Sequence, residues 1–241
     1  FFGLASPSPH DDPDAYRDQN VQLYKRRVAL INFSPDDSYL IDTFWARGGH
    51  EYDSSLHGIV QGTLNVLLSS KVLLKEQRGG SVLSPDVDYS SDMDDNGRVK
   101  SFADAPFYFA PPGDGFGFLS HPTFYSTDGP INLQWSATDK TDHQMYVPQF
   151  APSGTELITA TSPKPRAPID LTYALDHVKT TPDKTVRFTS VILPTEGANK
   201  IADVTQLQSA DSDESTFGLR IAKVLPSQGD DYYFAANDAS Q

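Results

Sequence analysis

The sequence predicts an all-β protein, an antiparallel β-sandwich with long loops and little helix. Short runs of residues alternate between apolar and polar side chains, as a half-buried strand requires. The 18 prolines and 16 glycines interrupt these runs at frequent intervals. No segment sustains a 3.6-residue period over the about three turns of an average helix.

The length and the distribution of loop residues predict one domain that follows a short extended segment. A chain of 241 residues is long enough for one large β domain with a buried core. Residues 1–20 are polar and rich in proline, so we expect them to run over a surface or to fray. Residues 21–241 are predicted to form a single β-sandwich domain. Within it, residues 79–117 show no period, and a loop that long is usually functional or ordered by a ligand.

The strands are predicted in chain order from β-branched and aromatic runs bounded by Pro, Gly, Asp or Asn. These runs are "RRVALINF" (26–33), "YLIDTFW" (39–45), "IVQGTLNVLL" (59–68), "ELITAT" (156–161) and "VRFTSVIL" (186–193). The alternation is clearest in "INLQWS", where Ile131, Leu133 and Trp135 form one face. "FGLRIAKV" repeats it, with an apolar face opposed to a face that carries Arg220 and Lys223. The segment "DVTQLQSA" (203–210) could instead form a turn or two of helix.

Charge and cysteine content exclude several classes of partner and chemistry. The chain has 19 Lys and Arg against 32 Asp and Glu, a net charge of −13. Such a surface repels nucleic acids and anionic membranes, so we expect neither as a partner. The absence of cysteine excludes disulfides, thiolate metal sites and a cysteine nucleophile. We expect an acidic bacterial protein that is secreted or periplasmic, and the start at Phe1 suggests a chain processed or excised from a longer one.

The segment "WARGGHEYDSSLHG" (45–58) concentrates side chains that could contact a substrate. On a regular strand His50 and His57 would point to opposite faces, so a shared metal needs an irregular turn, which Gly48 and Gly49 permit. The alternative is structural: His57 bonds a backbone group near Gly58 and Tyr52 packs in the core. The candidate substrate contacts are Trp45, Arg47, His50, Tyr52 and His57.

Two further sites are candidates for ligands. "DMDDNG" offers the first half of a calcium loop, in which oxygen ligands alternate and a glycine makes the bend. The position of the bidentate Glu is Ala103, so we place Ca²⁺ on Asp92, Asp94, Asn96 and Asp104, with a hydrated acidic turn as the alternative.

The basic run "YKRR" (24–27) adds Arg27 as a contact for a carboxylate or sulfate, unless the run is a solvated face with salt bridges. The aromatic segment 106–118 could stack on sugars or plug one end of the sandwich.

Several segments, in order, resemble the sheet region of the heparinase II/III-like polysaccharide lyases. They are "LYKRRVALIN", "YLIDTFWARGGHEYDSSLHG", "GTELITATSPKPR", "VRFTSVILPTEG" and "DDYYFAAND". That family joins an N-terminal helical toroid to a C-terminal β-sandwich and cleaves uronic-acid polysaccharides by β-elimination. In such a reaction a base removes the C5 proton, a neighbouring group neutralises the carboxylate, and an acid protonates the leaving oxygen.

The resemblance implies a supporting role for this chain. The His-Asn-Thr segment of the family's zinc site does not occur here, and no helical toroid can be built from these residues. We therefore assign no zinc ligand and no catalytic acid or base. The expected partners are an acidic polysaccharide, bound by the parent enzyme, and the helical toroid of the same protein. The alternative is a stand-alone carbohydrate-binding or architectural β-sandwich without enzymatic activity.

Overall fold

The computed structural model describes residues 21–58, 62–82, 116, 119–139, 142–162, 171–207, 215–225 and 229–237. The prediction of an all-β sandwich is confirmed, since strands dominate these ranges and every pairing between them is antiparallel. The strands are β1 (Leu23–Asn32), β2 (Ser38–Arg47), β3 (Glu51–His57), β4 (Gly62–Leu67), β5 (Val72–Gln77), β6 (Ser120–Thr127), β7 (Ile131–Ala137), β8 (His143–Phe150), β9 (Glu156–Thr161), β10 (Thr172–Lys179), β11 (Val186–Glu196), β12 (Ile201–Leu207), β13 (Thr216–Lys223) and β14 (Asp231–Ala236). In the described part of the chain, no helix is long and apolar enough to cross a membrane.

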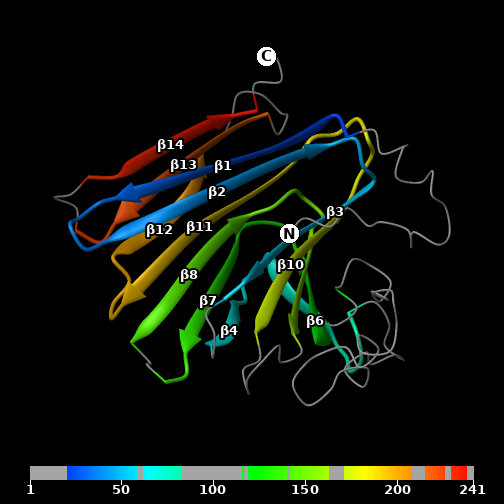
Figure 1. Cartoon of the computed structure of the whole chain (residues 1–241), viewed down its shortest axis with the longest axis horizontal. Helices are drawn as coiled ribbons and strands as arrows, with labels where there is room; N and C mark the ends of the chain where they lie inside the picture. The colour runs from blue at the N-terminus through cyan, green and yellow to red at the C-terminus, as the bar shows by residue number, and fades with distance from the viewer. Residues whose placement is uncertain are drawn as a thin grey trace, which may run out of the picture.

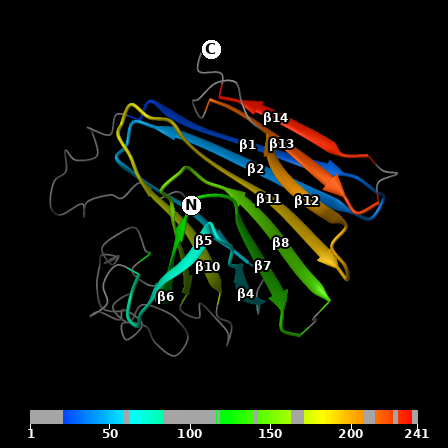
Figure 2. The same ribbon diagram turned by 180° about the vertical axis from the view of Figure 1, so that it is seen from behind.

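The strands form three sheets, which we call A, B and D. Sheet A has the order β1-β2-β11-β8-β7-β4, sheet B the order β3-β10-β9-β6-β5, and sheet D the order β12-β13-β14. Figures 1 and 2 show sheet A running across the molecule, with sheet D on one side and sheet B on the other. Sheet A is therefore the middle layer, and its two faces are covered by different partners.

Sheet D covers one face of sheet A through an apolar cluster. From sheet A the cluster takes residues of β2, β8 and β11, and from sheet D it takes residues of β12 and β13. Strands β7 and β4 contribute nothing to it. The cover is consequently partial, because it stops near β8. The buried members are Tyr39, Ile41, Phe150, Val191, Leu193, Ile201, Phe217, Leu219 and Ile221.

The opposite face of sheet A packs on sheet B through two clusters. One gathers around Trp135 and Leu157 at the β7–β8 side, and the other around Phe44 and Phe188 at the β2–β11 side. The alternation predicted for "INLQWS" is confirmed, because Ile131, Leu133 and Trp135 are almost completely buried. The outer face of sheet B carries a fourth cluster, against which Phe116 packs. Phe116 is the only described residue of the aromatic segment 106–118.

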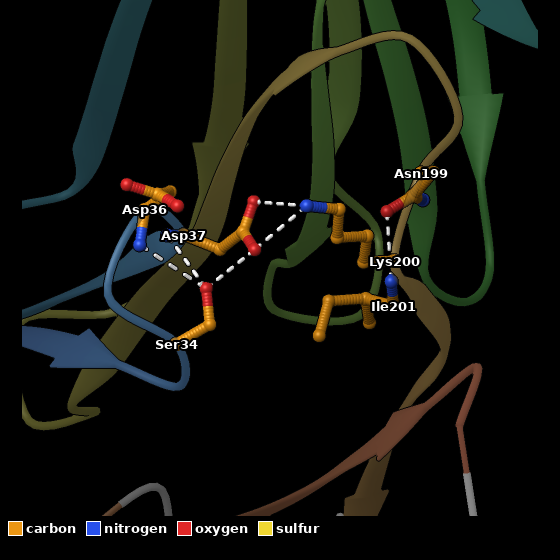
Figure 3. A network of polar contacts seen from close by, with 6 residues as sticks. All are labelled: Ser34, Asp36, Asp37, Asn199, Lys200 and Ile201. Atoms are coloured by element: carbon orange, nitrogen blue, oxygen red, sulfur yellow. Dashed lines mark hydrogen bonds and ion pairs between the residues drawn. The ribbon is translucent and has the colours of Figure 1, made fainter.

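Polar contacts join the turn between β1 and β2 to the turn between β11 and β12 (Figure 3). Lys200 Nζ donates to both carboxylate oxygens of Asp37, at 2.6 and 2.7 Å. Ser34 Oγ donates to the same carboxylate, and Asn199 Oδ1 accepts from the backbone N–H of Ile201 at 2.9 Å. The Lys200 ammonium, with help from Ser34, lowers the pKa of Asp37. These contacts fix the start of β12 relative to sheet A.

Two sequence predictions are wrong. The helical alternative for 203–210 fails because the described part of that segment lies in β12, where Val and Thr fit a pleated edge strand.

Lys223 does not belong to the polar face of β13. It follows Ile221 by two residues and shares its inward side, and its side chain is only 7% exposed. Its Nζ donates to Asp231 Oδ1 at 2.9 Å, and Tyr39 Oη donates to the other oxygen of that carboxylate at 2.7 Å.

Candidate functional site

Trp45 lies inside the sandwich. It pairs across the sheet with Arg187 of β11, so both side chains are on the side that faces sheet D. There the Arg187 guanidinium lies 4.1 Å from the centroid of the Phe217 ring, and its Nη1 donates to Thr216 O at 3.3 Å. The indole of Trp45 is completely buried and presents no face to solvent.

The turn after β2 is closed by Tyr52. Gly48 has a φ of 111°, a left-handed conformation that favours glycine. The Gly49 N–H donates to Tyr52 Oη at 2.6 Å, and the tyrosine ring is buried in the cluster between sheets A and B. The Gly-Gly segment therefore carries the chain from sheet A to sheet B, with Tyr52 as its anchor.

The two histidines of this segment lie at opposite ends of β3. His57 Nδ1 is 3.3 Å from Gly58 O, and its ring packs on Tyr173 with centroids 5.3 Å apart. His50 precedes β3 and is exposed. The structure thus places Tyr52 and His57 as the structural alternative describes, and contact of His50 or His57 with a substrate stays a prediction.

The two candidate arginines are not brought together. Arg47 ends β2 and is half-buried, and its Nε has no partner among the described residues. Arg27 lies on β1 and lines a cavity of about 510 Å³ with the ends of β12, β13 and β14. Their role as substrate contacts also stays a prediction.

A histidine that the sequence did not single out is held between carboxylates on the outer side of sheet B. His177 of β10 places Nδ1 2.8 Å from Asp53 Oδ1 and Nε2 3.1 Å from Glu51 Oε1, both on β3. The hydrogen bond to Asp53 is the main reason why the pKa of His177 is raised. Because both ring nitrogens face carboxylates, neither is available to activate a serine. Only the register of β3 against β10 brings these groups together.

A buried carboxyl lies next to this histidine on the other face of β10. Asp176 is 2% exposed, and its Oδ1 has no hydrogen-bond partner among the described residues. It alternates with Ala174 and Val178, which belong to the clusters between sheets A and B. Desolvation raises its pKa to about 7. Its burial between these two clusters makes it a residue of the core.

A groove of about 810 Å³ lies beside β12. It begins where sheet D stops covering sheet A. One side is formed by Asn132 of β7 and by Tyr146, Val147 and Pro148 of β8, and the other by β12 and the turn that precedes it. β12 is the edge strand of sheet D, so one edge of its backbone is unpaired within the described residues. The full lining is Leu67, Ser69, Lys71, Pro130, Asn132, Leu133, Tyr146, Val147, Pro148, Leu193, Asn199, Ile201, Ala202, Asp203, Val204, Thr205 and Gln206.

The polar lining of this groove is mostly neutral. Its lining includes the amide residues Asn132, Asn199 and Gln206 and the hydroxyl residue Thr205. Tyr146 is held in place by its hydroxyl, which donates to Gln144 Oε1. Such side chains can exchange hydrogen bonds with many hydroxyls of one ligand. The groove can therefore bind a long polar molecule without strong charge.

Lys71 is the one cation that lines the groove among the described residues. Its stem lies against Gly129, where a Cβ would be 2.6 Å from Lys71 Cδ. The Asp128 N–H also donates to Lys71 O at 2.8 Å, which joins the turn before β5 to the turn before β7. The ammonium group is thus presented at one end of the groove by a fixed backbone and can meet an anionic group there.

The predicted calcium ligands Asp92, Asp94, Asn96 and Asp104 lie outside the described residues. Elsewhere, no three His, Asp or Glu side chains of the described part are arranged to hold a metal ion.

Comparisons with known proteins were made at the level of sequence and of structure. No family model and no curated protein matches the chain. Among solved structures, a heparinase III gene product covers 98% of this chain with 12% identity and a TM-score of 0.37. The same product with methylated lysines covers 88% with 10% identity and a TM-score of 0.35, and a further crystal structure of heparinase III covers 90% with 11% identity and a TM-score of 0.39. The chain spans 25 to 27% of the length of these structures. At these values the likeness assigns neither a family nor an activity to this chain.

Proposed function

We propose that this chain is the β-sandwich portion of a heparinase II/III-like polysaccharide lyase, and that it binds the uronic-acid polysaccharide without supplying the catalytic acid or base. The observation that carries the proposal is the groove beside β12, with its neutral hydrogen-bonding lining and its single lysine. The ordered segments that resemble the lyase family, among them "YLIDTFWARGGHEYDSSLHG", support the choice of substrate.

The lining of the groove fits a uronic-acid chain better than it fits an anion of high charge density. Hydroxyls along a polysaccharide can pair with the amides and hydroxyls of β7 and β12. A uronate carboxylate can pair with Lys71 in a charge-assisted hydrogen bond. Asp203 is the only carboxylate of the lining, so a polymer with one charge on some of its sugars meets little repulsion there.

The positions of the remaining polar groups support the proposed supporting role. In the described structure Tyr146 is bonded to Gln144, and His177 is bonded to two carboxylates on another sheet. Neither group is placed to take a C5 proton from a sugar in the groove. In this proposal, the acid and base belong to another part of the parent enzyme, such as the helical toroid.

Binding and turnover by the isolated chain test the proposal together. Calorimetric titration with uronic-acid oligosaccharides should give binding, while ultraviolet absorbance should detect no unsaturated product. Replacement of Lys71 by Gln should weaken this binding by up to about fivefold, the factor that corresponds to about 1 kcal/mol for an exposed ion pair. The loss should shrink as salt is added, because exposed charges are screened.

Lys184→Gln is the matched control, since it removes the same charge from an exposed turn between β10 and β11. It should leave the affinity unchanged. Turnover by the isolated chain would contradict the supporting role. Equal affinity of both variants and the parent chain would contradict the assignment of the groove.

A further inference from the structure

The outer face of sheet D carries two exposed aromatic rings. Phe234 and Tyr232 occupy alternate positions of β14, so both point away from the cluster that joins sheets A and D. They are 69% and 59% exposed, high values for aromatic side chains in a folded sheet. Exposed apolar groups that are gathered on one face mark a surface of interaction more often than scattered ones do.

The ring of Phe234 occupies space that is open because its neighbour across the sheet is a glycine. Gly218 of β13 pairs directly with Phe234. A Cβ at Gly218 would come within 3.1 Å of Phe234 Cδ1 and Cε1, and within 3.3 Å of Leu207 Cβ. The ring therefore lies over Gly218 and beside Leu207, while most of its surface stays exposed to solvent.

Tyr232 lies in a row of paired residues, next to the row of Gly218 and Phe234, whose other members are polar. Arg220 pairs with Tyr232, and Arg220 Nε donates to Asp230 Oδ2 at 2.6 Å. Thr205 of β12 pairs with Arg220 on its other side and donates through its hydroxyl to Asp203. Aromatic faces and fixed polar groups thus lie in adjacent rows, a combination that differs from a purely apolar protein contact.

The charges of this face select the kind of ligand. Asp203 and Asp230 outnumber Arg220, so the polar row carries one net negative charge in a chain whose net charge is already −13. Sulfates and uronates would be repelled from it. A neutral sugar meets no electrostatic repulsion at this row, and its polarised C–H groups are attracted by the negative face of an aromatic ring.

We propose that the outer face of sheet D is a second binding site, in which Phe234 and Tyr232 stack on successive sugars of a neutral glycan chain while Arg220 donates hydrogen bonds to its hydroxyls. The two rings are about 7 Å apart along the strand, so neighbouring parts of one extended chain can reach both. The two aromatic rings do not line the groove beside β12, and the ligand carries no charge; the two sites share only Asp203 and Thr205 of the edge strand β12.

The test is titration of the whole chain with neutral glucose- and mannose-based oligosaccharides and, separately, with uronic-acid oligosaccharides. Phe234→Ala and Tyr232→Ala should each weaken binding of the neutral oligosaccharides at least about fivefold and leave binding of the uronic-acid ones unchanged. Gly218→Val should also weaken it, because the new side chain lifts the Phe234 ring from the sheet. The melting temperature of each variant identifies any general loss of folding.

Two matched controls separate this site from other surfaces. Leu30→Ala removes a side chain that is 66% exposed on β1 and should not change glycan affinity. Lys71→Gln should affect only the uronic-acid ligands. Neutral oligosaccharides that fail to bind, or that bind the folded Phe234→Ala variant as well as the parent, would overturn the proposal. A uronic-acid ligand whose affinity depends on Phe234 would overturn the selection for neutral glycans.

Discussion

Replacement of Asp176 by Asn should stabilise the protein at neutral and alkaline pH. The carboxyl is 2% exposed between sheets A and B, and burial raises its pKa from 3.8 to about 7. Asn has nearly the same volume and cannot ionise, so packing is kept while the charge is removed. The substitution therefore isolates the cost of a buried carboxylate.

The magnitude follows from the difference between the two pKa values. Below about pH 4 the carboxyl is neutral in both the folded and the unfolded chain, and it costs nothing. As the pH rises from about 4 toward 7, the Asp176 carboxyl ionises in the unfolded chain but stays protonated in the folded one, so the free energy of unfolding falls steadily. Above about pH 7 the cost is complete. A difference of about three pH units, at about 1.4 kcal/mol for each, amounts to ~4 kcal/mol.

Urea denaturation at about pH 5 and about pH 8 measures this effect. The parent chain should lose stability between the two conditions, whereas Asp176→Asn should lose much less, so that the gap between their midpoints widens at the higher pH. Asp139→Asn is the matched control, because it removes the same charge from an exposed position. A gap that stays constant with pH would refute the reasoning, since only ionisation of Asp176 makes it grow.

Two further substitutions probe other contacts of the fold. His177→Gln removes a group whose raised pKa stabilises the folded state fully below about pH 6.5 and progressively less above it. The urea midpoints of the variant, measured from about pH 6 upward, should therefore lose this dependence on pH. An unchanged dependence would show that the contacts of His177 with Asp53 and Glu51 are not its source. Gly58→Ala would place a Cβ 1.8 Å from Trp135 Cδ1, so the indole must move, and we expect a loss of about 1–3 kcal/mol in the free energy of unfolding. Gly79→Ala is its control, since a Cβ there meets nothing within 4 Å, and equal stability of the two variants would contradict the close contact.

The strands that were predicted, among them β2, β7 and β11, could be recognised because their side-chain alternation is local. A buried face can be predicted from the alternation of Ile131, Leu133 and Trp135 without knowing which strand pairs with them. The alternation of β10, a segment for which no strand was predicted, puts Asp176 on one face with Ala174 and Val178; its burial could have been inferred from that spacing. Lys223 was misplaced because a long basic side chain is usually exposed, whereas here its Nζ donates to Asp231 at the edge of the core, and the other oxygen of that carboxylate accepts from Tyr39.

The candidate sites could not be predicted from spacing, because they depend on pairing between distant segments. The groove needs β12 to lie beside β7 and β8, although some 50 residues or more separate them in the chain. The platform of Phe234 needs Gly218 to be its partner in exact register, and no local pattern gives that register. The contact of His177 with Asp53 spans 124 positions of the sequence.

The position of β1 at the end of sheet A has a consequence for the behaviour of the protein in solution. β1 is the end strand of sheet A among the described residues, and Val28 and Leu30 on it are 54% and 66% exposed, so the strand offers an apolar edge for association with another molecule. Lys25, Arg26 and Arg27 stand in the first half of the same strand. When two such edges approach with their strands parallel, their basic halves lie side by side and repel each other. Colloidal stability of this protein should therefore be limited by salt, which screens that repulsion, before it is limited by unfolding.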